Sequence, residues 1–190
     1  MTDTLRIDPS ACAVLFIDIQ DKLHAAMADG PRRSVERYAP ILVEAARRFD
    51  LPVVVSEQYP QGLGRTIAPL EAALVDLGDR VYRFDKLEFS VCRTPAFADL
   101  YARLDRTQWV VCGEETHVCV YQSVRGLCAR GAAVHVPRDA VASRAEANVE
   151  VGLRLIERAG GIVTCTEAVV FDLLQRAGTD DFKALSRRIR

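Results

Sequence analysis

The sequence predicts a three-layer α/β/α domain built around a doubly wound, mostly parallel sheet of six strands. Six short apolar or β-branched segments alternate with segments of helical pattern, and this alternation is typical of parallel sheets covered by helices. The first segment is a nearly continuous apolar run, as in a strand buried on both faces. No linker, repeat or low-complexity stretch interrupts the 190 residues, so we expect one domain, residues 1–190.

The first half of the chain begins with the clearest strand. Residues 11–18 form an apolar run that ends in the carboxylate of Asp18. Residues 34–49 carry apolar side chains at helical spacing and predict a helix. The valines at 53–55 predict the second strand. Residues 56–66 contain two glycines and a proline, so we expect a loop at the carboxyl end of that strand.

The second half continues the same alternation and closes with two short helices. Further strands are predicted at residues 80–84, 109–112, 132–136 and 162–165, and helices at residues 67–77, 95–104 and 145–159. Pro95 opens one of these helices and Gly160 ends another. After the fourth strand, Gly113 allows a sharp turn into a helix that carries Cys119 in its first turn and ends at Gly131.

Composition and charge exclude several classes of protein. Hydrophobic residues make up 49% and charged residues 27% of the chain, as in an ordinary globular protein. A net charge of −1 gives no electrostatic footprint for nucleic acid, and no apolar run approaches membrane-spanning length. The first residues lack a signal-peptide pattern. Because the six cysteines form no Cys-x-x-Cys pair, we expect reduced thiols and a cytoplasmic protein.

Polar or nucleophilic residues follow four of the predicted strands. Asp18, Glu57, Lys86 and Cys119 lie at or beyond carboxyl ends of strands, which is the edge where ligands bind in such sheets. We therefore expect these side chains to converge on one pocket. A thiol early in a helix lies at the positive end of the helix dipole, which lowers its pKa. The alternative is a buried structural cysteine.

The expected cluster contains a base and a cation, the groups that activate a thiol as a nucleophile. Asp18 would take the thiol proton if partial burial raised its pKa toward neutrality, and Lys86 would stabilise the charges. Simpler alternatives make Asp18 a turn cap and Lys86 a solvated loop lysine. No histidine is an evident base, because His24 falls in a predicted loop, His135 lies mid-strand and His117 would point elsewhere.

Three motifs carry this cluster in a fixed order. They are Phe-Ile-Asp-Ile-Gln around Asp18, Lys86 ahead of Phe89-Ser90, and Gly113-x-x-Thr116-x-x-Cys119-Val120. Together they resemble the isochorismatase-like cysteine hydrolases, and the resemblance covers essentially the whole chain. Further segments are most similar to the isochorismatase domain-containing protein subgroup, namely residues 56–66, 139–144, 166–168 and 182–185.

The resemblance implies a Rossmann-like hydrolase with an Asp-Lys-Cys triad, carried here by Asp18, Lys86 and Cys119. Asp18 would deprotonate the thiol, and the positive charge of Lys86 would hold the thiolate and the carboxylate in a reactive arrangement. The implied oxyanion hole uses the backbone amides of Glu115 and Cys119, with a cis peptide bond at Glu114–Glu115. An acyl-thioester intermediate would follow, and water would release the acid. Family members commonly form homo-oligomers.

Two departures from family patterns narrow the expected activity. Nicotinamidases of the family carry a metal-binding Asp-x-His after the second strand, where this chain has Ser56-Glu57-Gln58, and no histidine lies between His24 and His117. The ligands of such a zinc site are missing, so we expect no metal and no cofactor. True isochorismatases lack the nucleophilic cysteine, so Cys119 disfavours that activity as well.

The sequence therefore predicts a cysteine hydrolase of a small amide, ureido or related acyl C–N substrate, without nucleic-acid or membrane partners. Two alternatives stay open: a binding or redox-responsive protein with the same fold, and non-covalent vinyl-ether hydrolysis by Asp18. The substrate-binding candidates share a place in loops at the pocket mouth: Gln20, Glu57, Gln58, Tyr59 and Phe89.

Other polar residues receive weaker predictions. Arg144 would bind a substrate carboxylate or form a surface ion pair. Cys92, close to Lys86 in sequence, would be a second exposed thiol. The other four cysteines are expected to be packing residues: Cys12, Cys112, Cys128 and Cys165.

Overall fold

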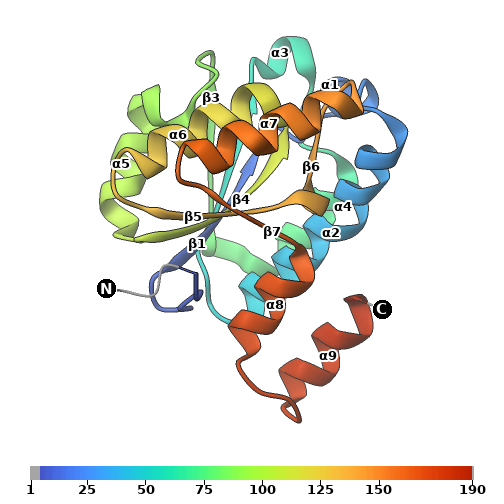
Figure 1. Ribbon diagram of the computed structural model, residues 1–190, viewed down its shortest axis with the longest axis vertical. Coiled ribbons are helices and arrows are strands. Elements are labelled where there is room, and N and C mark those ends of the chain that lie inside the picture. Colours follow the sequence, from blue (N-terminus) through green and yellow to red (C-terminus); the bar gives the residue numbers. More distant parts are fainter. Residues whose placement is uncertain (1–4, 190) are drawn as a thin grey trace.

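A computed structural model of the chain describes residues 5–189, and at its centre is a seven-stranded parallel sheet (Figure 1). The strands lie in the order β3-β2-β1-β4-β5-β7, and β6 pairs with the end of β4. Their bounds are β1 Cys12–Ile17, β2 Val53–Gln58, β3 Val81–Lys86, β4 Gln108–Glu114, β5 Ala133–Pro137, β6 Val141–Ala142 and β7 Ile162–Thr164. The predicted three-layer class is confirmed. The strand beyond the predicted six is β6, a two-residue pairing.

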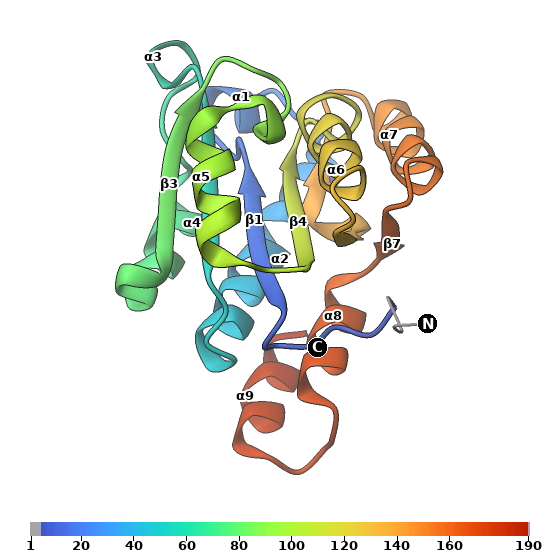
Figure 2. The same cartoon turned by 90° about the vertical axis from the view of Figure 1, so that its left-hand side faces the viewer.

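Helices cover both faces of this sheet. One face packs against α2 (Asp29–Arg48), α4 (Ala68–Leu74) and α8 (Thr166–Leu174), and the other against α5 (Pro95–Leu104), α6 (Tyr121–Cys128) and α7 (Glu146–Arg158). Helix α9 (Asp180–Ile189) packs on α2 and α8. Figure 2 shows α5 in front of the strands and α2 behind them. Two short helices, α1 (Asp21–Ala25) and α3 (Pro60–Leu63), lie at the carboxyl end of the sheet.

Strand β1 explains why the core has two halves. All six of its residues are buried, and successive side chains of a strand point to opposite faces. Cys12, Val14 and Phe16 pack on the α2 side, and Ala13, Leu15 and Ile17 pack on the opposite side. Because β1 pairs with both β2 and β4, the residue that follows it, Asp18, is held near the middle of the carboxyl edge.

Some strands and helices begin or end at residues other than those predicted. Strands β2 and β3 continue to Gln58 and Lys86, because these two residues are register partners in the sheet. Helix α2 begins at Asp29, five residues before the predicted start at 34. His24 lies in helix α1, so its predicted place in a loop is wrong.

Gly113 has a different role from the predicted sharp turn. It lies within β4 with a φ of 136°, and a Cβ atom there would lie 2.1 Å from the Ile17 carbonyl oxygen. Glycine is therefore needed for β1 and β4 to approach each other. The chain turns later, through a π-helical turn at Thr116–Val120 that leads into α6. Within residues 5–189, no helix combines the length and apolar character needed to cross a membrane.

Candidate active site

The side chains of Asp18 and Lys86 form a buried ion pair at the carboxyl edge of the sheet. Lys86 Nζ donates to Asp18 Oδ2 at 2.6 Å, and neither side chain is exposed to solvent. Strand β2, between the strands that carry these residues, supplies the remaining partners. Ser56 Oγ donates to Asp18 Oδ1 at 2.7 Å, and Lys86 Nζ donates to Gln58 Oε1 at 2.8 Å. The alternative of a solvated Lys86 is therefore wrong.

Cys119 adds a thiol to this cluster. It lies in the π-helical turn, is 5% exposed, and interacts with the buried side chain of Asp18. Burial, followed by the negative charge of Asp18, raises the pKa of Cys119 to about 12, although the charge of Lys86 opposes the shift. The net shift is opposite to the lowering expected from the helix dipole, and burial is its largest cause. At neutral pH the site therefore holds a thiol.

Burial also raises the pKa of Asp18, although Lys86, Ser56 and Cys119 each oppose the shift. The direction agrees with the sequence-based condition for Asp18 to act as a base. A carboxylate with a raised pKa that interacts with a thiol is suited to accept the thiol proton. Lys86 then faces whichever of the two groups carries the negative charge.

Glu114 and Glu115 form the segment that joins β4 to the π-helical turn, and contacts hold it on two sides. Arg144 and Ala142 supply the contacts on the first side. The peptide bond Glu114–Glu115 is cis, as the family resemblance implies. Glu115 Oε2 accepts from the backbone N and the Nε of Arg144 at 2.9 and 3.1 Å. Thr116 Oγ1 donates to the Ala142 carbonyl at 3.0 Å. Of the two predicted roles for Arg144, the structure supplies the ion pair.

The same segment is anchored on the α2 side by a buried histidine. His24 Nδ1 lies 2.6 Å from Glu114 Oε1, and His24 Nε2 lies 3.0 Å from Glu36 Oε1. Burial lowers the pKa of His24, but the hydrogen bonds and charges of Glu114 and Glu36 raise it overall. Burial raises the pKa of Glu114, with His24 opposing. Sequence reasoning missed this cluster, because its members lie in α1, α2 and β4 and share no spacing pattern.

Three of the predicted substrate-binding residues are held by internal hydrogen bonds. Gln20 Nε2 donates to the Gln58 carbonyl at 3.0 Å, and Gln20 Oε1 accepts from the Gln58 backbone N at 2.7 Å. Glu57 accepts from the Thr66 backbone N at 2.7 Å and from Arg65 Nη1 at 2.6 Å. Burial favours a higher pKa for Glu57, but Arg65 and Thr66 lower it overall. Glu57 therefore supports the loop after β2 and is not part of the Asp18 cluster.

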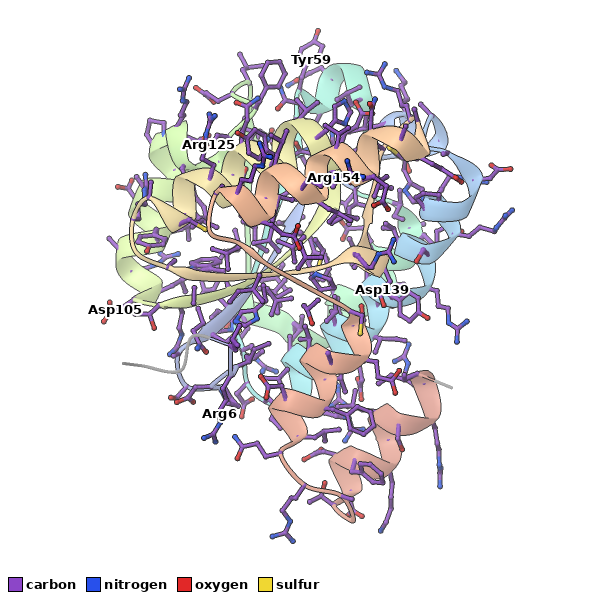
Figure 3. The ribbon with its side chains drawn as sticks, in the orientation of Figure 1. Arg6, Tyr59, Asp105, Arg125, Asp139 and Arg154 are labelled. Carbon is purple, nitrogen blue, oxygen red and sulfur yellow. The ribbon has the colours of Figure 1, made fainter. Side chains whose placement is uncertain are left out.

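Tyr59 and Phe89 are exposed, at 52% and 55%. Figure 3 shows Tyr59 at the outer edge of the molecule, above α3. It borders a cavity of about 390 Å³, whose lining residues are Tyr59, Pro60, Gln61, Asp85, Lys86, Leu87 and Glu88. Lys86 is common to this cavity and the buried cluster, but Asp18 and Cys119 are not among the lining residues. Phe89 is exposed nearby in sequence but is not among the lining residues.

All six cysteines are free thiols, but they differ in burial. Cys12 and Cys112 are buried, and Cys92, Cys128 and Cys165 are half-buried. The prediction of an exposed Cys92 is wrong, because its thiol donates to the Ser123 carbonyl and burial raises its pKa to about 11. In the part of the chain that the structure describes, no group of His, Cys, Asp or Glu is arranged to hold a metal ion.

The sequence matches a known family over most of its length. The family model for the Isochorismatase domain covers residues 12–168. The chain belongs to the isochorismatase family. This chain is 33% identical to the secreted isochorismatase effector Isc1 of Phytophthora sojae, over 97% of this chain and 87% of that protein. It is 30% identical to isochorismatase domain-containing protein 2 of Xenopus laevis, over 93% and 83%.

Solved structures share the isochorismatase-family fold. A structure described as MAR1 ribonuclease from Caenorhabditis elegans has a TM-score of 0.87 and 33% identity, covering 97% of this chain and 92% of that chain. YcaC from Pseudomonas aeruginosa has a TM-score of 0.88 at 20% identity, covering 96% and 91%. The nicotinamidase of Staphylococcus aureus has a TM-score of 0.71 at 16% identity, covering 81% and 98%. The last two similarities concern the fold alone.

Proposed function

We propose that this isochorismatase-family protein is a cysteine hydrolase of small amide, ureido or related acyl C–N compounds. Cys119 is the nucleophile, Asp18 is the general base and Lys86 is the cation that balances their charge. The observation that carries the proposal is a buried carboxylate, paired with an ammonium group at 2.6 Å, whose charge acts on a buried thiol. A purely structural cysteine has no need of such partners.

In the proposed reaction, the Sγ proton of Cys119 passes to the Asp18 carboxylate as sulfur attacks the substrate carbonyl carbon. The new C–S bond places negative charge on the carbonyl oxygen, where the backbone amides of Glu115 and Cys119 stabilise it. The C–N bond then breaks, and the amine leaves with the proton held by Asp18. Asp18 next takes a proton from water, whose oxygen attacks the thioester. Release of the acid returns the proton to Cys119.

The surroundings of the site favour a small substrate with an apolar portion. Tyr59 and Leu87 line the cavity with large exposed apolar side chains, and the acidic group of Glu57 is already paired with Arg65. A substrate of this kind can bury apolar surface there without displacing an ion pair. The C. elegans relative is described as a ribonuclease, but a net charge of −1 offers little attraction for a polyanion.

An activity screen over small amides, carbamoyl compounds and esters tests the proposal, with single-stranded RNA as a comparison substrate. We expect turnover that Cys119→Ala abolishes, and an acyl adduct on Cys119 in intact-protein mass spectrometry. Iodoacetamide should alkylate Cys119 in preference to the other thiols, and Asp18→Asn should remove that preference. Full turnover by Cys119→Ala would instead support non-covalent hydrolysis by Asp18. A thiol no more reactive than the others, with no turnover, would support a binding or redox-responsive protein.

We also propose a cytoplasmic location and a homo-oligomeric state. Six free cysteines are typical of a reducing compartment, although the P. sojae relative is described as secreted. Cell fractionation tests the location. Light scattering tests the oligomer, and a mass equal to that of one chain would refute it.

A further inference from the structure

Glu114 is an unusual residue to find beside the proposed oxyanion site. It is the last residue of β4, its side chain is fully buried, and its Oε2 has no hydrogen-bond partner among the described residues. The charges of Asp18 and Glu115 act on it from the same region and disfavour its ionised form. A buried carboxylate in this position costs free energy unless a cation is paired with it.

His24 is the group that pairs with Glu114. Its Nδ1 lies 2.6 Å from Glu114 Oε1, and its ring is itself anchored by Glu36 from α2 at 3.0 Å. The backbone N of His24 also donates to the Gln20 carbonyl at 2.7 Å, which fixes the start of α1 next to Asp18. Both ring nitrogens therefore face carboxylates, and the ring connects α2 and α1 to the end of β4.

The residue after Glu114 supplies one of the two proposed oxyanion amides. Glu115 is held from the other side by Arg144, through two contacts of 2.9 and 3.1 Å. Two ion pairs thus act on the segment that carries the Glu115 amide, one on the residue itself and one on the residue before it. An oxyanion donor must be held in place before the charge develops, because reorganisation during the reaction would raise the barrier.

We infer that His24 is a positioning residue that holds the Glu115 backbone amide in place through its ion pair with Glu114. The inference rests on the proposed function, because the amide matters only if a carbonyl group reacts at Cys119. His24 itself touches neither the thiol nor the expected substrate, so its effect is confined to steps that place charge on a carbonyl oxygen.

Two chemical probes separate this role from general damage to the site. p-Nitrophenyl acetate acylates a thiol through a tetrahedral oxyanion: the C–S bond forms, the ester C–O bond breaks, p-nitrophenolate leaves and the thiol proton passes to Asp18. Iodoacetamide alkylates the same sulfur by displacement of iodide, and no oxyanion forms. Each rate is measured on the full chain, with the background of Cys119→Ala subtracted.

In His24→Gln we expect acylation of Cys119 to slow by about 10-fold or more, since removal of a complete oxyanion donor costs roughly 10²–10³-fold. Alkylation by iodoacetamide should stay within about twofold of wild type, because it needs only the thiol and its base. Equal loss of both rates, or an unchanged acylation rate, would overturn the inference. A wild-type Cys119 that reacts selectively with neither probe would instead refute the proposed function.

A double variant tests the pairing if His24→Gln alone folds poorly. In His24→Gln with Glu114→Gln, two amides replace the ion pair and can hydrogen-bond without a buried charge. We expect this double variant to acylate faster than His24→Gln. A further loss of rate would contradict positioning through Glu114. Glu36→Gln is the matched control: it removes a charge from the other ring nitrogen and leaves the bond to Glu114, so its acylation rate should stay within about threefold of wild type.

Discussion

The two buried charge clusters at the carboxyl edge differ in how completely they are shielded from solvent. We call the Asp18–Lys86 pair closed, and the cluster of His24, Glu36 and Glu114 open. The Asp18–Lys86 pair has no solvent exposure on either side chain, and Ser56 and Gln58 complete its hydrogen bonding. The His24 cluster opens to solvent through Glu36, whose side chain is 37% exposed, and one oxygen of Glu114 has no hydrogen-bond partner within residues 5–189. The first cluster is therefore shielded from solvent, whereas the second is in contact with solvent through Glu36.

The largest effect should come from breaking the closed pair. Lys86→Met leaves Asp18 buried without its cation, so we expect the free energy of unfolding to fall by about 3–5 kcal/mol. Chemical denaturation of the purified variant measures this loss. The double variant Asp18→Asn with Lys86→Met removes both charges and should recover much of the stability. A double variant as unstable as the sum of its single variants would contradict a coupled pair.

Removing a neutral partner of the same pair should have a smaller effect. Ser56→Ala deletes the 2.7 Å hydrogen bond to Asp18 and should cost about 1.5–3 kcal/mol, as expected for a bond to a charged group. Since Ser56 lowers the pKa of Asp18, this pKa should rise in the variant. The proposed base must be ionised to act. As pH is lowered, the variant should therefore lose activity at a higher pH than wild type does. A pH–rate profile identical to wild type would contradict this role for Ser56.

The open cluster should make stability depend on pH near neutrality. The pKa of His24 is raised in the folded protein, so its ion pairs stabilise the fold fully below the unfolded pKa of about 6.5 and less as pH rises through the folded value. Glu114, Glu36 and Arg32 are the charged groups around it, and ionised Glu114 is required for the pair. The stability difference between wild type and His24→Gln should therefore narrow above neutral pH. Denaturation midpoints from pH 5.5 to 9 measure this, and a constant difference would contradict it.

The smallest effect is expected at the solvent end of the open cluster. Glu36→Gln removes a charge from a half-exposed side chain, where water and Arg32 share the interaction. We expect a stability change of about 0–1 kcal/mol, as for other exposed ion pairs, with greater loss at low salt. Thermal melts at two salt concentrations test this. A loss as large as that of Lys86→Met would show that the two clusters do not differ as proposed.

The sheet, and the polar residues at the carboxyl ends of its strands, could be predicted because each strand is recognisable from the apolar pattern of its own residues. The apolar run of β1 and the valines of β2 are buried where expected. Asp18 and Lys86 follow or end neighbouring strands, and the order of elements brings them to one edge. The sequence predicts ends for β2 and β3 that are too early, because Gln58 and Lys86 belong to the sheet through pairing with each other rather than through their own propensity.

The sequence by itself determined the fold class, the family motifs and the set of side chains at the carboxyl edge, since these depend on apolar patterning and chain order. Tertiary structure alone decided that burial raises the pKa of Cys119, that Glu57 is paired with Arg65, and that His24 reaches Glu114. The reason is physical. Protonation and ion pairing depend on burial and on distances of a few ångströms between residues far apart in sequence, and only the packing of the elements sets both.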